Sequence, residues 1–142
     1  MNREFATIKV EDRGGGLLLM MLNRPEVANA LNTQMGRDLL AFFDDINSAP
    51  AQARSIVLSG AGERAFCAGG DIRRLYDLGR AGDHAAQLTF WREEYQLDRR
   101  IKTYPKPIVV LADGITMGGG VGIMSRSVSG CSALVSRGPW VQ

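Results

Sequence analysis

The first third of the chain alternates apolar segments with polar ones. Residues 5–10 and 17–22 are mainly apolar, and the polar, glycine-rich stretch 11–16 lies between them. This arrangement predicts a β-hairpin. Apolar residues then recur every three or four positions over 31–46. That spacing predicts an amphipathic helix, which must end before Pro50.

The middle of the chain continues with alternating strand and helix patterns. Residues 55–59 form a short strand-like run, and a glycine-punctuated connection over 60–67 follows. Residues 71–78 and 83–104 have helical patterns, and the apolar run 106–112 predicts a buried strand. Because no repeat or linker divides these segments, they predict a single mixed α/β unit.

The C-terminal part of the chain lacks such a pattern. Residues 114–142 contain no Asp or Glu, and residues 125–132 follow neither a period of two nor one of 3.6. We expect either a flexible terminus or sequence that does not belong to the design of the fold.

The composition excludes several classes of protein. The 142 residues are 45% hydrophobic and 23% charged, which fits one soluble folded domain. A net charge of only +2, without a basic stripe, argues against a nucleic-acid partner. No apolar run approaches the ~20 residues that cross a bilayer, and residues 1–5 lack the apolar core of a secretory signal. We therefore expect no membrane partner and a cytoplasmic location.

The cysteine and histidine content limits the chemistry further. Cys67 and Cys131 are far apart and outside any C-x-x-C pair, so no disulfide framework and no metal site are expected. His84 follows Asp83, a typical helix N-cap residue, and is expected to be solvated. Cys67 follows Phe66 and is expected to be a small buried residue rather than a nucleophile.

Three glycine-containing segments are candidates for ligand binding. Residues 60–65 match the G-x-G-x-x-G/A pattern, but a loop follows where a dinucleotide site requires a helix. Two other loops, 68–70 and 118–120, each precede a helical stretch. Their N–H groups could approach a carbonyl oxygen that becomes negative. These loops are therefore either an oxyanion hole or two tight strand-to-helix turns.

Glu94 is the strongest single acidic candidate. On the longest predicted helix it has Phe90, Trp91 and Leu97 three or four positions away, so its carboxylate emerges from an apolar face. Buried carboxylates are costly unless paired, and those in clefts often mark function. Asp98, one turn farther on, leaves open the alternative of an ordinary glutamate at the rim.

Three segments carry a family resemblance. Residues 23–25, 65–72 and 114–122 resemble the enoyl-CoA hydratase/isomerase (crotonase) superfamily in sequence, order and spacing. With residues 90–95, they look most like the branch that hydrolyses 3-hydroxyisobutyryl-CoA, a thioesterase reaction of valine breakdown. The resemblance extends over about residues 5–123.

The resemblance implies a fold and a reaction. The fold would be the α/β crotonase-like ββα spiral, incomplete at the C-terminus. Backbone N–H groups of Ala68 and Gly119 would hold the carbonyl oxygen of an acyl-CoA thioester, and no cofactor is implied because CoA is part of the substrate. Hydratases place a water-activating glutamate at the position of Gly122, so the glycine here disfavours hydration and favours hydrolysis.

The resemblance also assigns substrate-binding residues. Two segments of the chain would lie along the CoA moiety, and one glutamate matches a substrate-contacting glutamate of the hydrolases. The residues so assigned are Arg24, Ala28, Gly69, Gly70, Asp71, Ile72 and Glu94.

The sequence departs from the hydrolase pattern after the second glycine loop. The hydrolases continue with a catalytic glutamate in a Met-Pro-Glu context and an aspartate near a glycine cluster, and neither occurs here. Residues 1–123 are therefore interpreted as the N-terminal part of a crotonase-like domain, and residues 124–142 as an atypical tail, frame-shifted or disordered. Such a truncated copy would be weak or inactive.

Two alternatives to the hydrolase remain open: an enoyl-CoA hydratase/isomerase and a non-catalytic acyl-CoA-binding fragment. A full-length chain would form a homo-oligomer, as members of the family commonly do. A eukaryotic chain whose targeting segment had been removed would lie in the mitochondrial matrix.

Overall fold

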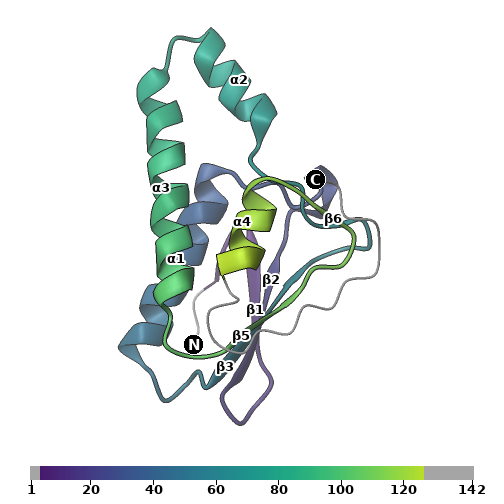
Figure 1. Ribbon diagram of the computed structural model, residues 1–142, viewed down its shortest axis with the longest axis vertical. Helices are drawn as coiled ribbons and strands as arrows, with labels where there is room; N and C mark the ends of the chain where they lie inside the picture. Colours follow the sequence, from purple (N-terminus) through teal and green to yellow (C-terminus); the bar gives the residue numbers. More distant parts are fainter. Residues whose placement is uncertain (1–3, 127–142) are drawn as a thin grey trace.

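The computed structural model describes residues 4–126, in which helices and strands alternate along the chain (Figure 1). In chain order the elements are β1 (Ile8–Asp12), β2 (Leu17–Leu22), the short 3-10 helix η1 (Pro25–Val27), α1 (Thr33–Ser48), β3 (Ser55–Gly60), β4 (Ala65–Cys67), α2 (Ile72–Arg80), α3 (His84–Thr103), β5 (Ile108–Leu111), β6 (Ile115–Thr116) and α4 (Gly119–Arg126).

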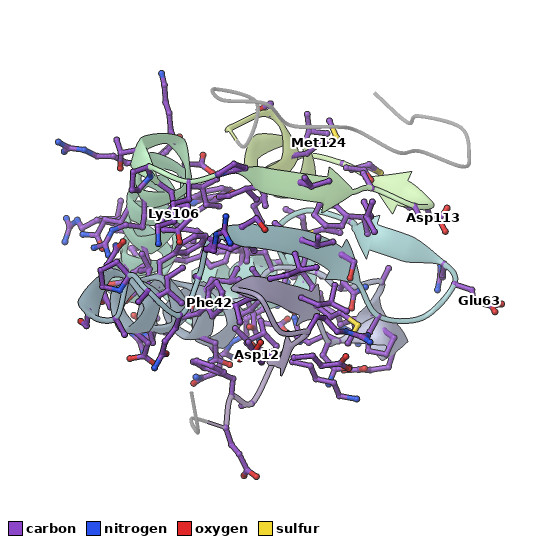
Figure 2. The ribbon with its side chains drawn as sticks, turned by 90° about the horizontal axis from the view of Figure 1, so that it is seen from below. Asp12, Phe42, Glu63, Lys106, Asp113 and Met124 are labelled. Atoms are coloured by element: carbon purple, nitrogen blue, oxygen red, sulfur yellow. The ribbon has the colours of Figure 1, made fainter. Side chains whose placement is uncertain are left out.

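The main sheet of the described residues has the strand order β1-β2-β3-β5. β1 and β2 are antiparallel, which confirms the predicted hairpin. β3 and β5 add in parallel, with Ile56 opposite Ile108, as strands joined by long crossover connections do. The carboxyl ends of β3 and β5 therefore reach the same edge, where Glu63 and Asp113 lie in Figure 2.

A smaller parallel pairing joins β4 to β6, with Ala65 opposite Ile115. The sequence pattern predicts a loop over 60–67, so it misses β4, and it also misses β6. These strands have three and two residues, too few to show a period of two. They matter because each leads directly into one of the two glycine loops.

Helix α1 provides much of the core. The Asn32 side chain caps it by accepting a hydrogen bond of 2.8 Å from the N–H of Met35. Phe42 and Phe43 on its predicted apolar face are completely buried, and Phe42 lies between the helix and the strands in Figure 2. The other largest fully buried side chains are Phe66, Met20, Leu22, Leu31, Met35, Leu39, Ile46, Ile56, Leu58 and Leu97.

Helix α3 packs against the other three α-helices of the described residues. It runs beside α1 (Figure 1) and also contacts α2 and α4. Asp83 caps it by accepting a hydrogen bond of 3.0 Å from the N–H of Ala86, which confirms the predicted N-cap. On its outer side Trp91 and Tyr95 are exposed, whereas Phe90 is buried. Of these three aromatic side chains, only Phe90 therefore contributes to the core.

Helix α4 ends the described part of the chain. The predicted boundary between residues 123 and 124 falls inside this helix, which continues to Arg126. The rest of the predicted tail, residues 127–142, lies outside the described residues. Over residues 4–126, the structure has no helix with the length and apolar character that a membrane span requires.

Replacing Asp38 with alanine is expected to destabilise the fold by about 1–3 kcal/mol. This buried carboxylate of α1 accepts hydrogen bonds from the N–H and the hydroxyl of Thr7, at 2.8 and 2.7 Å. Without it, both donors lose their acceptor inside the protein. Urea unfolding measures the loss, and Asp77→Ala, at an exposed position of α2, is the matched control. Equal stability of the two variants would contradict the assignment.

Candidate functional site

The two glycine loops lie against each other. An ideal Cβ built on Gly69 would be 2.9 Å from the carbonyl oxygen of Met117 and 3.5 Å from the nitrogen of Gly119. From the other loop, a Cβ on Gly118 would be 3.8 Å from the Cα of Gly69. The β4–β6 pairing therefore brings together two segments that are about fifty residues apart in sequence.

Glycine is required at this meeting point for steric reasons. Gly69 has a φ of +101°, a conformation that residues with a Cβ rarely adopt. Gly120 is tighter still, because its Cβ would lie 2.3 Å from the carbonyl oxygen of Cys67. The loops are therefore tight turns, and the same lack of side chains leaves backbone N–H groups uncovered.

The N–H of Ala68 is already engaged. It donates a hydrogen bond of 3.0 Å to the carbonyl oxygen of Ala28, so the expectation that it offers an open donor is corrected by the structure. A left-handed turn at Ala28 and Asn29, with φ of 54° and 53°, presents this carbonyl. The Asn29 amide holds the turn: its oxygen accepts from the N–H of Arg24 at 2.9 Å, and its nitrogen donates to the Ala65 carbonyl at 2.9 Å.

Gly70 and Gly119 present open N–H groups instead. Within residues 4–126, neither N–H donates a hydrogen bond. The parallel bridge between Leu31 and Gly70 uses the carbonyl of Gly69 and the N–H of Asp71, so Gly70's own N–H faces away from it. Gly119 is the first residue of α4, where N–H groups lack intrahelical partners and carry partial positive charge.

Two of the predicted CoA-binding residues form an ion pair beside these loops. Nη2 of Arg24 lies 3.3 Å from Oδ2 of Asp71, and its Nη1 donates to the carbonyl of Ala30 at 2.6 Å. Arg24 and Asp71 line a cavity of about 370 Å³, to which Arg74 adds a second guanidinium. Ile72 is 67% exposed and does not line this cavity.

Glu94 lies directly against the second glycine loop. Its Oε1 would be 2.6 Å from an ideal Cβ on Gly119. One turn farther along α3, the Asp98 oxygens would be 3.5 and 3.6 Å from a Cβ on Gly122. Burial first, and then the negative charge of Asp98, raises the pKa of the Glu94 carboxyl. The structure therefore brings Glu94 and Gly119 together.

Replacing Glu94 with glutamine is expected to stabilise the fold at neutral pH. The folded-state pKa of Glu94 is above its ordinary value, so ionisation lowers stability as the pH rises through the folded pKa. Below the unfolded pKa the carboxyl is neutral in both states, and the variant and the parent should then unfold alike. Urea unfolding between pH 4 and 8 measures this, with Glu93→Gln as control. A stability gain that persisted unchanged at the lowest pH would contradict the explanation.

Cys67 is a structural residue of the site. Burial, and secondarily the charge of Glu94, raises the pKa of its thiol to about 11, so at neutral pH it is not a thiolate nucleophile. This agrees with the expectation of a small buried residue. Over residues 4–126, no group of three or more His, Cys, Asp or Glu side chains is arranged to hold a metal ion.

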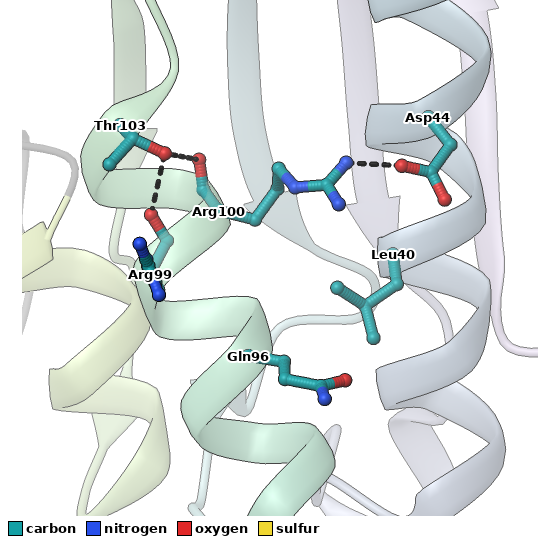
Figure 3. A pocket seen from close by; sticks show the side chains of 6 residues that line it. All are labelled: Leu40, Asp44, Gln96, Arg99, Arg100 and Thr103. Atoms are coloured by element: carbon teal, nitrogen blue, oxygen red, sulfur yellow. Dashed lines mark hydrogen bonds and ion pairs between the residues drawn. The ribbon is translucent and has the colours of Figure 1, made fainter.

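Another cavity, of about 460 Å³, lies between α1 and α3 (Figure 3). An ion pair between Asp44 and Arg100 crosses it, and Leu40 and Gln96 also line it. None of the predicted site residues lines this cavity. It is therefore separate from the glycine loops.

A family model described as enoyl-CoA hydratase/isomerase matches residues 17–129. The chain therefore belongs to the enoyl-CoA hydratase/isomerase family, whose members share the crotonase fold.

Solved structures of two similar proteins have the same fold over most of this chain. A carnitinyl-CoA dehydratase from Mycobacterium thermoresistibile is 39% identical with a TM-score of 0.77, over 84% of this chain and 34% of that one. An enoyl-CoA hydratase from Rhodobacter sphaeroides is 37% identical with a TM-score of 0.80, over 92% and 38%.

Curated proteins similar to this chain include mitochondrial 3-hydroxyisobutyryl-CoA hydrolases. The mitochondrial 3-hydroxyisobutyryl-CoA hydrolase of Gallus gallus is 47% identical over 109 residues, which are 77% of this chain and 28% of that protein. The mitochondrial 3-hydroxyisobutyryl-CoA hydrolase of Xenopus tropicalis is 50% identical over 105 residues, 74% and 27% of the two chains. The chain thus spans less than a third of the length of these relatives.

Proposed function

We propose that this chain carries the acyl-CoA-binding and oxyanion part of a CoA-thioester hydrolase, with 3-hydroxyisobutyryl-CoA as the substrate. The observation that carries the proposal is the meeting of two glycine loops, with open N–H groups at Gly70 and Gly119 and a carboxyl group against Gly119. Similarity to hydrolases that are 47% and 50% identical supports the choice of substrate.

In the proposed reaction, the thioester carbonyl oxygen lies between the N–H groups of Gly70 and Gly119. Water adds to the carbonyl carbon and gives up a proton, and the C=O electron pair moves to the oxygen. The two N–H groups stabilise the resulting negative charge, an effect worth about 10²–10³-fold in rate for each donor. The carbonyl then re-forms, the C–S bond breaks, and the CoA thiolate takes up a proton. The products are the free acid and CoA.

The residues around the loops have supporting roles in this proposal. Ala68 fixes the first loop through its hydrogen bond to Ala28. Arg24 provides positive charge for the phosphates of CoA, and its ion pair with Asp71 keeps the guanidinium at the cavity. Glu94 contacts the acyl group or its carbonyl. For a eukaryotic chain, the mitochondrial relatives support a matrix location.

Binding without turnover is the second candidate. The observation behind it is again the pair of open N–H groups at Gly70 and Gly119, which can hold a thioester carbonyl oxygen whether or not hydrolysis follows. In this case the loops would hold the thioester and no acid would be released. Hydration of a double bond is less favoured, because Gly122 supplies no carboxylate.

Incubation of the chain with 3-hydroxyisobutyryl-CoA separates these candidates. Thiol released to a chromogenic disulfide, together with free acid detected by mass spectrometry, is the expected result for a hydrolase. Saturable binding without thiol release indicates a binding role, and hydration of crotonyl-CoA indicates a hydratase. Absence of any binding to either thioester would contradict the proposal. Unacylated CoA is the matched control for binding through the nucleotide part alone.

A further inference from the structure

Helix α3 presents two carboxyl groups to two glycines of helix α4. Glu94 faces Gly119, where the ideal Cβ would be 2.6 Å from its Oε1. Asp98 faces Gly122, where the ideal Cβ would be 3.5 and 3.6 Å from its two oxygens. Positions four apart on one helix lie on the same face. The two carboxyl groups therefore form one row along the packed surface between α3 and α4.

Among the described residues, no cation forms an ion pair with the Glu94 carboxylate. From its own helix, Asp98 faces it one turn away, and Lys102 follows Asp98 by another turn. From β4, the titratable group that interacts electrostatically with Glu94 is the buried thiol of Cys67. From α4, residues 119–125 contribute no charged side chain, and the contact is with glycine backbone. Arg37 is the cation on α1, and its Nε lies 3.1 Å from Oε1 of Glu93, the residue before Glu94.

A negative charge on Glu94 would oppose the proposed chemistry. The carboxyl lies against Gly119, whose N–H is a proposed donor to the thioester oxygen. An ionised carboxylate there would repel the negative charge that develops on this oxygen, whereas a protonated carboxyl can itself donate a hydrogen bond. The site thus works best with a proton on Glu94, and a nearby negative charge favours that form.

We propose that Asp98 is a positioning residue that acts through Glu94: its charge, one helical turn away and facing the same glycine helix, keeps a proton on Glu94 so that this carboxyl can donate to the bound thioester. The inference rests on the proposed function for the location of the thioester. It adds a division of roles between the two carboxyl groups, in which Glu94 contacts the thioester and Asp98 does not touch the substrate. The direction in which burial and Asp98 shift the Glu94 pKa supports it.

The test is an NMR titration of the Glu94 side-chain carboxyl carbon in the chain and in its Asp98→Asn variant. In the parent the midpoint should lie above the ordinary glutamate value, and in Asp98→Asn it should fall toward that value. Asp98→Glu, which keeps the charge, should restore a raised midpoint. Glu93→Gln is the matched control, since it removes a carboxylate that pairs with Arg37, and it should shift the midpoint less. An unchanged Glu94 midpoint in Asp98→Asn would overturn the proposal.

A binding measurement links the proton to the thioester. The affinity of the chain for a ketone analogue of 3-hydroxyisobutyryl-CoA, in which CH₂ replaces the sulfur, should fall as the pH passes the Glu94 midpoint. In Asp98→Asn the fall should occur at lower pH. If the affinity for the analogue does not change as the pH passes the Glu94 midpoint, Glu94 does not act as a hydrogen-bond donor to the bound thioester. If the analogue fails to bind at every pH, the proposed function itself fails, and the titration of Glu94 still reports separately on Asp98.

Discussion

Replacing Gly70 with proline is expected to lower the rate of CoA-thioester hydrolysis by about 10²–10³-fold, the loss typical of one oxyanion donor. Proline has no N–H, so the variant removes the proposed donor and no side-chain chemistry. The bridge to Leu31 uses the carbonyl of Gly69 and the N–H of Asp71, and both survive the substitution. The first loop should therefore keep its pairing.

Gly70→Ala is the matched control for this variant. It retains the N–H, and its Cβ would approach the Phe90 ring at 3.4 Å, a contact that a small shift of the ring relieves. Initial rates at saturating thioester, together with thermal unfolding of both variants, separate loss of the donor from loss of the fold. Equal rates for Gly70→Pro and Gly70→Ala would exclude the Gly70 N–H as an oxyanion donor.

Replacing Gly120 with alanine is expected to have the largest effect on the structure of the site. The new Cβ would lie 2.3 Å from the carbonyl oxygen of Cys67 and 2.9 Å from the Cβ of Cys67. Because these are atoms of the buried strand β4, helix α4 must move away from it. Overpacking of this kind typically costs about 1–3 kcal/mol, and the movement would also displace the N–H of Gly119 from the first loop.

Gly122→Ala provides the comparison on the same helix. Its Cβ would make only an ordinary contact with Asp98, at 3.5 Å, and alanine is favoured over glycine in a helix by about 1 kcal/mol. This variant should be at least as stable as the parent in urea, whereas Gly120→Ala should be less stable. If both variants proved equally stable, the close packing of α4 on β4 would be incorrect.

The longer elements could be predicted from the sequence because their patterns are local. The apolar spacing over 31–46 corresponds to α1, and the helical pattern over 83–104 corresponds to α3 within one residue at each end. The β4–β6 pairing could not be predicted, because such short strands are defined by a partner far along the chain. The exposure of Trp91 depends likewise on what covers the outer side of α3.

The site could be predicted in part. The two glycine loops and Glu94 stand out in sequence, and the structure places them together. The choice between Ala68 and Gly70 as the open donor could not be made from sequence. It depends on the left-handed turn at Ala28, whose carbonyl takes the N–H of Ala68. The spacing of hydrophobic residues carries no information about such tertiary hydrogen bonds. The direction of the Gly70 N–H likewise follows from the pairing with Leu31, which uses the neighbouring Gly69 carbonyl and Asp71 N–H.

The central claim is that the N–H groups of Gly70 and Gly119 hold the carbonyl oxygen of an acyl-CoA. The most direct measurement is an amide NMR titration of the chain with the ketone analogue of 3-hydroxyisobutyryl-CoA, and with unacylated CoA in parallel. We predict that the Gly70 and Gly119 amide signals move together along one saturable curve with the analogue, and hardly move with CoA. If CoA moves both signals equally, or the analogue leaves them unchanged while binding elsewhere, the claim is contradicted.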